Sequence, residues 1–277
     1  RGCRGVSVLA IVRTEWRRGW RSRRLWALAA TATLLLVGSV LTQSASPRAD
    51  LQPAEAAMYS GVTLFSLLFP LALLVGNYGA VAGEFDAGSA RYLLGLPNSR
   101  WAVLLGKVLG RTAVAWAGVL AAFVLCGTTL LVRFGRVPAV PFAAVGGLSL
   151  LFTAAWTAIG VGLSASARRG SRALAAGVGS YVVLVVYWLF VPDVNPESLT
   201  ARFVEDVLGL SARPGLYDFV FQAAPSTAYS FAVTRLLFDS TPARVFLRPW
   251  FLVFVLLGWV VAPTLLGYLR FRRIEIA

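Results

Sequence analysis

Charged side chains are concentrated in one short segment of this chain, residues 83–107, which separates two long apolar runs. The charged residues of the segment are Glu84, Asp86, Arg91, Arg100 and Lys107. The runs on either side, residues 56–81 and 112–132, contain no Lys, Arg, Asp or Glu. Because ionised groups are costly in hydrocarbon, charges at this density are expected in water or against another protein. The chemistry that they offer is ionic recognition of a partner.

Residues that could support catalysis or bind a metal are scarce in this sequence. The chain has no histidine, which is the commonest general base and transition-metal ligand. Its two cysteines, Cys3 and Cys126, are too few for a zinc framework. The acidic residues all lie in expected loops or at the ends of apolar runs, so an intramembrane enzyme is not expected.

The sequence also departs from the phosphate-binding loop of ATPases. That loop has the pattern G-x-x-x-x-G-K-[ST]. Around Gly106 and Lys107, the first glycine position holds Trp101 and the hydroxyl position holds Val108. ATP and its Mg²⁺ are therefore expected to bind a separate subunit, and we expect no cofactor in this chain.

The charged segment is predicted to contain a short amphipathic helix followed by a second helix. Apolar and small side chains recur at helical spacing at Phe85, Ser89, Tyr92, Leu93 and Leu96. Pro97 disfavours the helical conformation of the residue before it, so the first helix is expected to end there. Asn98 or Ser99 can cap the next helix, which is predicted to start at Arg100 and to include Lys107 in its first turns.

The order of residues in this segment resembles the cytoplasmic loop of type-2 permeases of ATP-binding cassette (ABC) transporters. The matching positions are Glu84, Gly88–Ser89, Leu93–Leu94, Pro97, Ser99–Arg100 and Gly106–Lys107. In that family the loop follows the second transmembrane helix and inserts into a groove on the ATPase subunit. Gly95 and Asn98 depart from the residues that are usual in the family.

The resemblance implies a set of residues that couple the permease to its ATPase. The set is Glu84, Asp86, Gly88, Ser89, Arg91, Pro97, Arg100 and Lys107. The two acids would face basic or amide donors of the ATPase, and Arg91 and Arg100 would face acids or lipid phosphates. The alternative is a loop helix that lies on the surface with solvated charges.

The composition is that of a polytopic, all-α membrane protein. Hydrophobic residues make up 58% of 277 and charged residues 14%, and the mean hydropathy is +0.73. A soluble domain would have about a quarter charged residues. The formal net charge of +14 does not indicate nucleic-acid binding, because the arginines gather beside apolar runs. They are typical of contacts with anionic lipids and of membrane topology.

Six membrane spans are predicted within a single permease domain, residues 1–277. They are residues 25–41, 57–81, 112–132, 142–165, 173–191 and 250–269. Glycines of the fourth span, Gly146–Gly147, Gly160 and Gly162, predict close contacts with other helices. Lys and Arg are more frequent on one proposed side, so both termini are expected in the cytoplasm and the protein in the cell membrane.

The first 24 residues are predicted to form a basic helix in the membrane interface. Its arginines and tryptophans recur at helical spacing, at Arg13, Trp16, Arg17, Trp20 and Arg21. The simpler interpretation is a positive flank of the first span. The two interpretations are compatible, and both stay open.

Residues 193–249 form the longest segment that does not resemble a membrane span. Leu199, Phe203, Val207 and Leu210 predict an amphipathic helix. Tyr217, Phe221 and residues 225–233 predict a second, partly embedded element. By resemblance to type-2 permeases, this segment would be a re-entrant lid at the outer end of the pathway. A surface cap that only packs on the bundle is the alternative.

The resemblance and the layout together imply a non-catalytic permease subunit. Its partners would be two ABC ATPase subunits, a second copy or a homologous permease, and membrane lipids, with no nucleic acid. Export is favoured over import. Permeases that are linked to copper-site assembly in nitrous oxide reductase are similar in size and layout. The alternative function is a membrane scaffold or assembly factor that does not transport.

Overall fold

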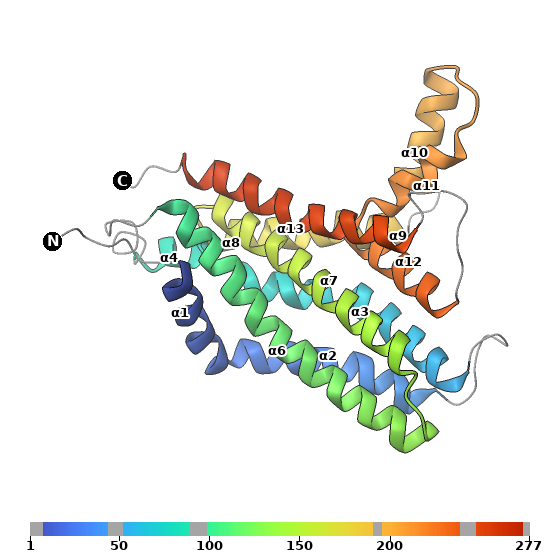
Figure 1. Cartoon of the computed structure of the whole chain (residues 1–277). Helices are drawn as coiled ribbons and strands as arrows, with labels where there is room; N and C mark the ends of the chain where they lie inside the picture. Colours follow the sequence, from blue (N-terminus) through green and yellow to red (C-terminus); the bar gives the residue numbers. More distant parts are fainter. Residues whose placement is uncertain (1–7, 44–51, 89–98, 191–195, 239–247, 274–277) are drawn as a thin grey trace.

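The computed structural model describes most of the chain, in five ranges separated by short gaps (Figure 1). The described ranges are residues 8–43, 52–88, 99–190, 196–238 and 248–273. Three residues of the predicted coupling set, Ser89, Arg91 and Pro97, lie outside these ranges. Most of the short amphipathic helix predicted before Pro97 lies outside them as well.

Every regular element in the described ranges is helical, which confirms the expected all-α fold class. The α-helices are α1 (Val8–Trp20), α2 (Arg23–Thr42), α3 (Pro53–Asn77), α4 (Ala82–Asp86), α6 (Arg100–Phe134), α7 (Ala139–Ser166), α8 (Gly170–Tyr181), α9 (Trp188–Phe190), α10 (Pro196–Arg202), α11 (Pro214–Gln222), α12 (Pro225–Leu237) and α13 (Pro249–Phe271). Two π-helical segments, η1 (Val182–Tyr187) and η2 (Phe203–Val207), continue α8 and α10.

Among the described residues, five helical stretches are long and apolar enough to cross a membrane. They are Pro53–Asp86, Arg100–Phe134, Ala139–Ser166, Gly170–Tyr187 and Pro249–Phe271. The sequence predicts six crossings, and the difference concerns the first one. The part of α2 whose side chains the structure describes without a gap, Trp26–Thr42, belongs to the shorter class of 10–17 residues. Length and composition alone therefore support five crossings.

The helix α6 begins where the sequence predicts and extends well beyond the predicted span. Ser99 is its N-cap, and the Ser99 Oγ accepts a hydrogen bond from the Ala102 N–H at 3.1 Å. The helix is 35 residues long and ends at Gly135, whose φ of 68° lies in the left-handed region. Lys107 consequently lies on a regular helix, in its third turn, where its side chain has a fixed direction.

The long helices pack side by side into a bundle with two distinct ends (Figure 1). Helix α13 packs along α7, and α6 packs against both α1 and α2. Helices α1 and α4, the start of α6 and the end of α13 gather at one end of the bundle (Figure 1). We call this the α4 end. The connection between α6 and α7 lies at the opposite end.

Aromatic side chains fill the core between α3, α7 and α12. Phe65 stacks on Phe69 with ring centroids 4.4 Å apart, and Phe152 stacks on Tyr229 at the same separation. All four side chains are buried. The Tyr229 hydroxyl lies 2.6 Å from the Ser149 Oγ, so the polar tip of the ring has a partner inside the bundle. Helix α12 is therefore part of the bundle, as expected for an embedded element.

Helices α7 and α13 cross at very close range because two glycines face each other. A Cβ on Gly162 would lie 2.4 Å from the Pro263 carbonyl oxygen, and a Cβ on Gly267 would lie 2.7 Å from the Gly162 Cα. In lipid, small residues bring helix backbones close enough for van der Waals packing to stabilise the pair. The predicted role of Gly162 in close packing is confirmed, whereas that of Gly147 is wrong, because a Cβ there would have no atom of the described residues within 4 Å.

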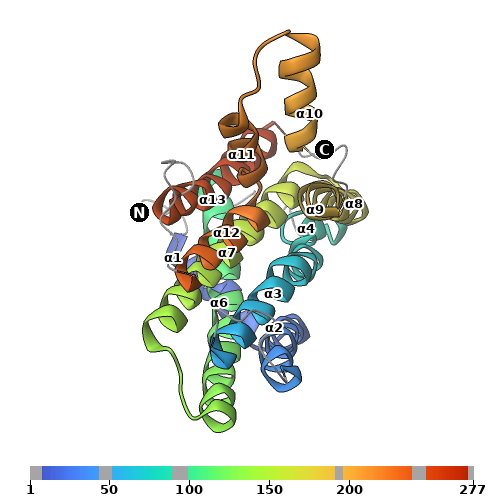
Figure 2. The ribbon, with the colours of Figure 1, turned by 90° about the vertical axis from the view of Figure 1, so that its right-hand side faces the viewer.

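The segment before the last helix divides into two parts. Helix α10 projects away from the bundle, whereas α11 lies at its base, where the Phe219 ring is 6.1 Å from that of Phe251 on α13 (Figures 1 and 2). Helix α12 packs against α3, α7 and α13. The apolar residues that predict an amphipathic helix are exposed on the projecting part, among them Leu199, Phe203 and Val207. Whether this segment is a re-entrant lid or a cap stays a prediction.

Candidate functional site: a charged junction at the α4 end

The predicted coupling residues that the structure describes lie at the α4 end of the bundle. Glu84 and Asp86 are on α4, and Gly88 follows it with a φ of 68°. Arg100 and Lys107 are on the first turns of α6. The residues are thus brought to one region, although they belong to two elements separated by residues 89–98.

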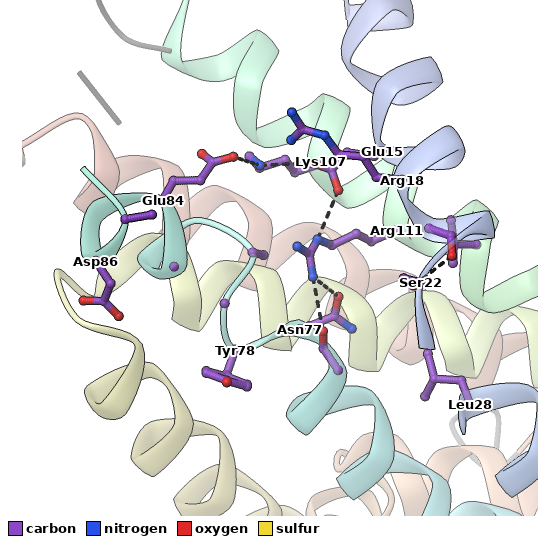
Figure 3. A pocket seen from close by; sticks show the side chains of 17 residues that line it. Glu15, Arg18, Ser22, Leu28, Asn77, Tyr78, Glu84, Asp86, Lys107 and Arg111 are labelled. Carbon is purple, nitrogen blue, oxygen red and sulfur yellow. Dashed lines mark hydrogen bonds and ion pairs between the residues drawn. The ribbon is translucent and has the colours of Figure 1, made fainter. Parts of the chain in front are cut away.

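Lys107 is the centre of this region, because its buried ammonium group contacts two carboxylates from different helices (Figure 3). The Lys107 Nζ lies 2.6 Å from the Glu84 Oε1 on α4 and 3.0 Å from the Glu15 Oε1 on α1. Its side chain is only 3% exposed. A buried charge needs close partners of opposite sign, so this contact fixes α1 and α4 to α6.

Arg111, one turn further along α6, extends the network to the end of α3. Its Nε lies 3.5 Å from the Glu15 Oε2. Its Nη1 donates hydrogen bonds to the Gly76 carbonyl oxygen at 3.2 Å and to the Asn77 Oδ1 at 3.4 Å. Four elements, α1, α3, α4 and α6, therefore meet in one set of ionic and polar contacts.

The electrostatic state of Glu15 follows from this arrangement. Burial alone would raise the pKa of the Glu15 carboxyl, but the positive charges of Lys107 and Arg111 outweigh that effect and hold the pKa below its usual value. Glu15 is therefore ionised at neutral pH. Its negative charge is balanced by Lys107 and Arg111 of α6.

The chain between α3 and α4 is fixed by a single hydroxyl on α7. The Ser164 Oγ donates to the Tyr78 carbonyl oxygen at 2.6 Å and accepts from the backbone N–H groups of Val81 and Ala82 at 2.9 and 3.1 Å. The side chain is fully buried. These bonds satisfy backbone groups in a turn that has no regular ladder of its own.

Asp86 and Arg100 connect the α4 end to two further helices. The Asp86 Oδ2 accepts a hydrogen bond from the Gly170 N–H, the first residue of α8, at 2.8 Å. The Arg100 Nη1 donates to the carbonyl oxygens of Phe271 and Arg272 at 2.8 Å each, at the end of α13. A cation at this position also interacts favourably with the negative end of the helix dipole.

The residues predicted for the interfacial helix lie on the exposed side of α1 and, for Arg21, directly after its end. Arg13, Trp16, Arg17, Trp20 and Arg21 are all exposed, while Glu15 on the same helix is buried against α6. The rings of Trp16 and Trp20 lie 5.8 Å apart. An apolar and basic face directed away from the bundle fits a lipid interface, and this location stays a prediction.

Three residues of the junction were not expected from the sequence: Glu15, Arg111 and Ser164. A signal for Glu15 exists, because it is the one acid among the arginines of the first 24 residues. The glycine pair Gly106 and Gly110 of α6 is a signal for the surface on which the helix of Glu15 packs. A Cβ on these glycines would lie 2.7 Å from the Ile11 Cβ and 2.6 Å from the Glu15 Cβ, so α1 packs directly on them.

The charged groups of the junction hold helices together. Its charges are used in contacts between helices, and the described residues contain no group of three His, Cys, Asp or Glu side chains that could hold a metal. Helix α4 contacts α6 through the Glu84–Lys107 ion pair and α8 through Asp86, and the turn before it contacts α7 through Ser164.

Comparison with known proteins gives an independent assignment. Residues 9–276 match the profile of the ABC-2 family transporter proteins. A protein of Pseudomonas aeruginosa, named probable ABC transporter permease protein NosY, is 30% identical over 187 residues, which is 65% of this chain and 67% of the relative. A protein of the same name from Stutzerimonas stutzeri is 33% identical over 117 residues, 42% of each chain. The chain belongs to the ABC-2 family of transporter proteins and is a membrane subunit of an ABC transporter.

Proposed function

We propose that this chain is the permease subunit of an ATP-driven exporter and that the α4 end receives the force from separate ATPase subunits. The ATPase would bind ATP and Mg²⁺, and this chain would contribute no catalytic residue. Binding and hydrolysis of ATP would move α4 and the segment that follows it, and the junction would pass the movement to the spans.

The observation that carries this proposal is the contact of Lys107 with Glu15 and Glu84. A short surface helix that only covered the bundle would not need a buried ion pair beneath it, because burying charge is costly. Here α4 is tied to the start of a 35-residue helix that is long enough to cross the membrane. A movement of α4 would therefore act directly on α6, a helix long enough to cross the membrane.

The proposed topology has six crossings, with α2 as the first and both termini in the cytoplasm of a cell-membrane protein. Seventeen residues is about the lower limit for a spanning helix, about 26 Å at 1.5 Å per residue, so α2 can cross if its flanking residues reach the interface. Basic residues support the orientation. Arg168 and Arg169 join α7 to α8 beside Asp86, and Arg270 is in the last turn of α13.

A complete transporter would contain a second permease, either another copy or a homologue. An apolar cavity between the described helices of the bundle, bordered by Leu36, Met58 and Phe123, measures only about 10 Å³, which is too small for a cargo. The exposed apolar faces of the spans would be divided between lipid and the second permease. Amphiphilic cargo suits a seam lined by apolar side chains. The relatives named NosY support the permease role and carry no further detail to this chain.

The proposal is tested by coexpressing the chain with the ABC ATPases of its source and measuring copurification and ATPase activity in lipid nanodiscs. The native chain is expected to retain an ATPase. Ala87→Trp places a bulky ring on an exposed residue directly after α4 and leaves the ion pairs intact. It is expected to weaken association by about tenfold, the effect of a lost contact worth about 1.4 kcal/mol.

The matched control is Val140→Trp, at an exposed residue of α7 at the opposite end of the bundle. It is expected to bind the ATPase like the native chain. If no ATPase copurifies with the native chain, the transport function loses its support and a scaffold or assembly role is favoured. If both tryptophan variants bind equally well, the docking surface is not at the α4 end.

A further inference from the structure

An open cavity of about 500 Å³ lies at the α4 end, between the bend that joins α1 to α2, the end of α3, α4 and the first third of α6 (Figure 3). Its volume is within the range of about 300–1,000 Å³ that is usual for small-ligand sites. We propose that this cavity binds the headgroup of a phospholipid that carries both a phosphate ester and a primary ammonium group.

The charges that line the cavity favour a zwitterion over a simple ion. Equal numbers of each sign are present: Arg18, Lys107 and Arg111 against Glu15, Glu84 and Asp86. A free anion would meet three carboxylates, and a free cation would meet three positive groups. A ligand with one charge of each sign can place both near opposite charges, so the cavity selects it against either ion.

The two charges at the rim of the cavity define where the ligand groups would lie. Arg18 and Asp86 are both exposed and lie on opposite sides of the cavity (Figure 3). Arg18 has no ion pair with the residues that the structure describes. Asp86 uses one oxygen for the Gly170 N–H, which leaves the other accessible. The ligand phosphate would contact Arg18, and its ammonium group would donate to Asp86.

The apolar part of the lining indicates that the phosphate ester belongs to a lipid. Leu28, near the start of α2, and Val114 of α6 border the cavity on the side of the spans. Acyl chains attached to the headgroup could run from these residues along the apolar surface of α2. The exposed Trp16 and Trp20 on α1 are of the type that lies at the level of lipid headgroups.

The proposal is tested with the purified chain in detergent, by native mass spectrometry during titration with single phospholipids. Phosphatidylethanolamine is expected to bind about tenfold more tightly than phosphatidylglycerol, which lacks the ammonium group, or phosphatidylcholine, whose ammonium has no N–H donors. Arg18→Gln and Asp86→Asn are each expected to weaken phosphatidylethanolamine binding by about tenfold. The amide oxygen that Asp86→Asn introduces would still accept the hydrogen bond from the Gly170 N–H, so the fold is retained.

Arg17→Gln is the matched control, because Arg17 is an exposed neighbour on α1 that does not line this cavity. It is expected to bind phosphatidylethanolamine like the native chain. Equal binding of all three lipids, or an equal effect of Arg17→Gln and Arg18→Gln, would overturn the site. Soluble phosphoethanolamine that binds as tightly as the lipid would overturn the lipid as the source. No ATPase takes part, so the result is independent of the proposed transport function.

Discussion

Replacement of Lys107 by methionine is expected to destabilise the protein by about 3–5 kcal/mol, the usual cost of removing one partner from a buried ion pair. The variant leaves Glu15 and Glu84 in the junction without their shared ammonium group. Chemical denaturation in detergent, followed by tryptophan fluorescence, measures the loss. Arg136→Met is the control, because the Arg136 side chain is 52% exposed and pairs with Glu55 at 3.5 Å, so its loss should cost about 0–1 kcal/mol.

The destabilisation caused by Lys107→Met is expected to depend on pH. In the native protein the pKa of Glu15 is below its ordinary value of 4.5, so its stabilising contribution is present above that value and is lost only as pH falls through the lower, folded-state pKa. Without Lys107, fewer positive charges oppose the effect of burial, so the pKa of Glu15 is expected to rise. The destabilisation should therefore shrink as pH falls from about 7 to about 5, because a neutral carboxyl is cheaper to bury.

A double replacement separates the effect of charge from that of packing. The combined replacement Glu84→Gln and Lys107→Met should recover part of the stability that Lys107→Met loses, since Glu84 then carries no unpaired charge and Glu15 keeps its contact with Arg111. If Lys107→Met is no less stable than Arg136→Met, the ion pairs do not hold the helices of the α4 end together. The same conclusion follows if the destabilisation is independent of pH and the double replacement restores nothing.

Replacement of Ser164 by alanine is expected to destabilise the protein by roughly 2–4 kcal/mol, because it leaves two buried N–H groups without an acceptor. The groups belong to Val81 and Ala82, in the turn that carries α4. Thermal unfolding measures the global cost, and hydrogen exchange of residues 78–88 measures the local one. Exchange in this segment should become faster, while exchange in the part of α7 that precedes its last turn should change little.

Ser166→Ala is the control for the hydroxyl itself. The Ser166 Oγ donates only to the Gly162 carbonyl oxygen of its own helix, at 2.9 Å, in the hydrogen bonds that the structure shows for it. Its removal leaves no backbone group of the turn unpaired and should be close to neutral. Equal effects of Ser164→Ala and Ser166→Ala would mean that the turn between α3 and α4 does not depend on α7.

Local sequence signals predicted several elements correctly. The apolar runs indicated the all-α fold, because no other regular structure satisfies the backbone of an isolated apolar segment in lipid. Pro97 and Ser99 located the start of α6, and the structure shows the Ser99 Oγ in the capping position. Gly162 indicated a close crossing, although only the structure identifies Pro263 and Gly267 as its neighbours.

The contacts of the charged segment could not be predicted from the sequence. Lys107 and Glu15 are 92 positions apart, and a hydropathy pattern gives no information about which charges meet. Arg111 stands beside an apolar run and resembles an ordinary flanking charge until α3 is placed next to it. Ser164 is one of many hydroxyl residues in the spans, and nothing local distinguishes it from Ser166.

The number of membrane spans could also not be fixed from the sequence. Residues 25–41 contain an apolar run whose pattern predicts a span, and the structure places this run in the 20-residue helix α2, Arg23–Thr42. The part of α2 whose side chains the structure describes without a gap, Trp26–Thr42, is at the lower end of the lengths that cross a bilayer. Length alone cannot decide such a case, because flanking side chains can extend the reach of a short helix to the interface.

The central claim is that the α4 end receives the nucleotide-driven change of the ATPase and passes it to the spans. Hydrogen exchange of the reconstituted complex, with and without ATP and vanadate, tests it directly. We predict slower exchange on nucleotide binding in residues 8–20, 78–88 and 100–111, and little change in residues 128–140 at the opposite end. Unchanged exchange in all three segments of the α4 end, with nucleotide bound to the ATPase, would contradict the account.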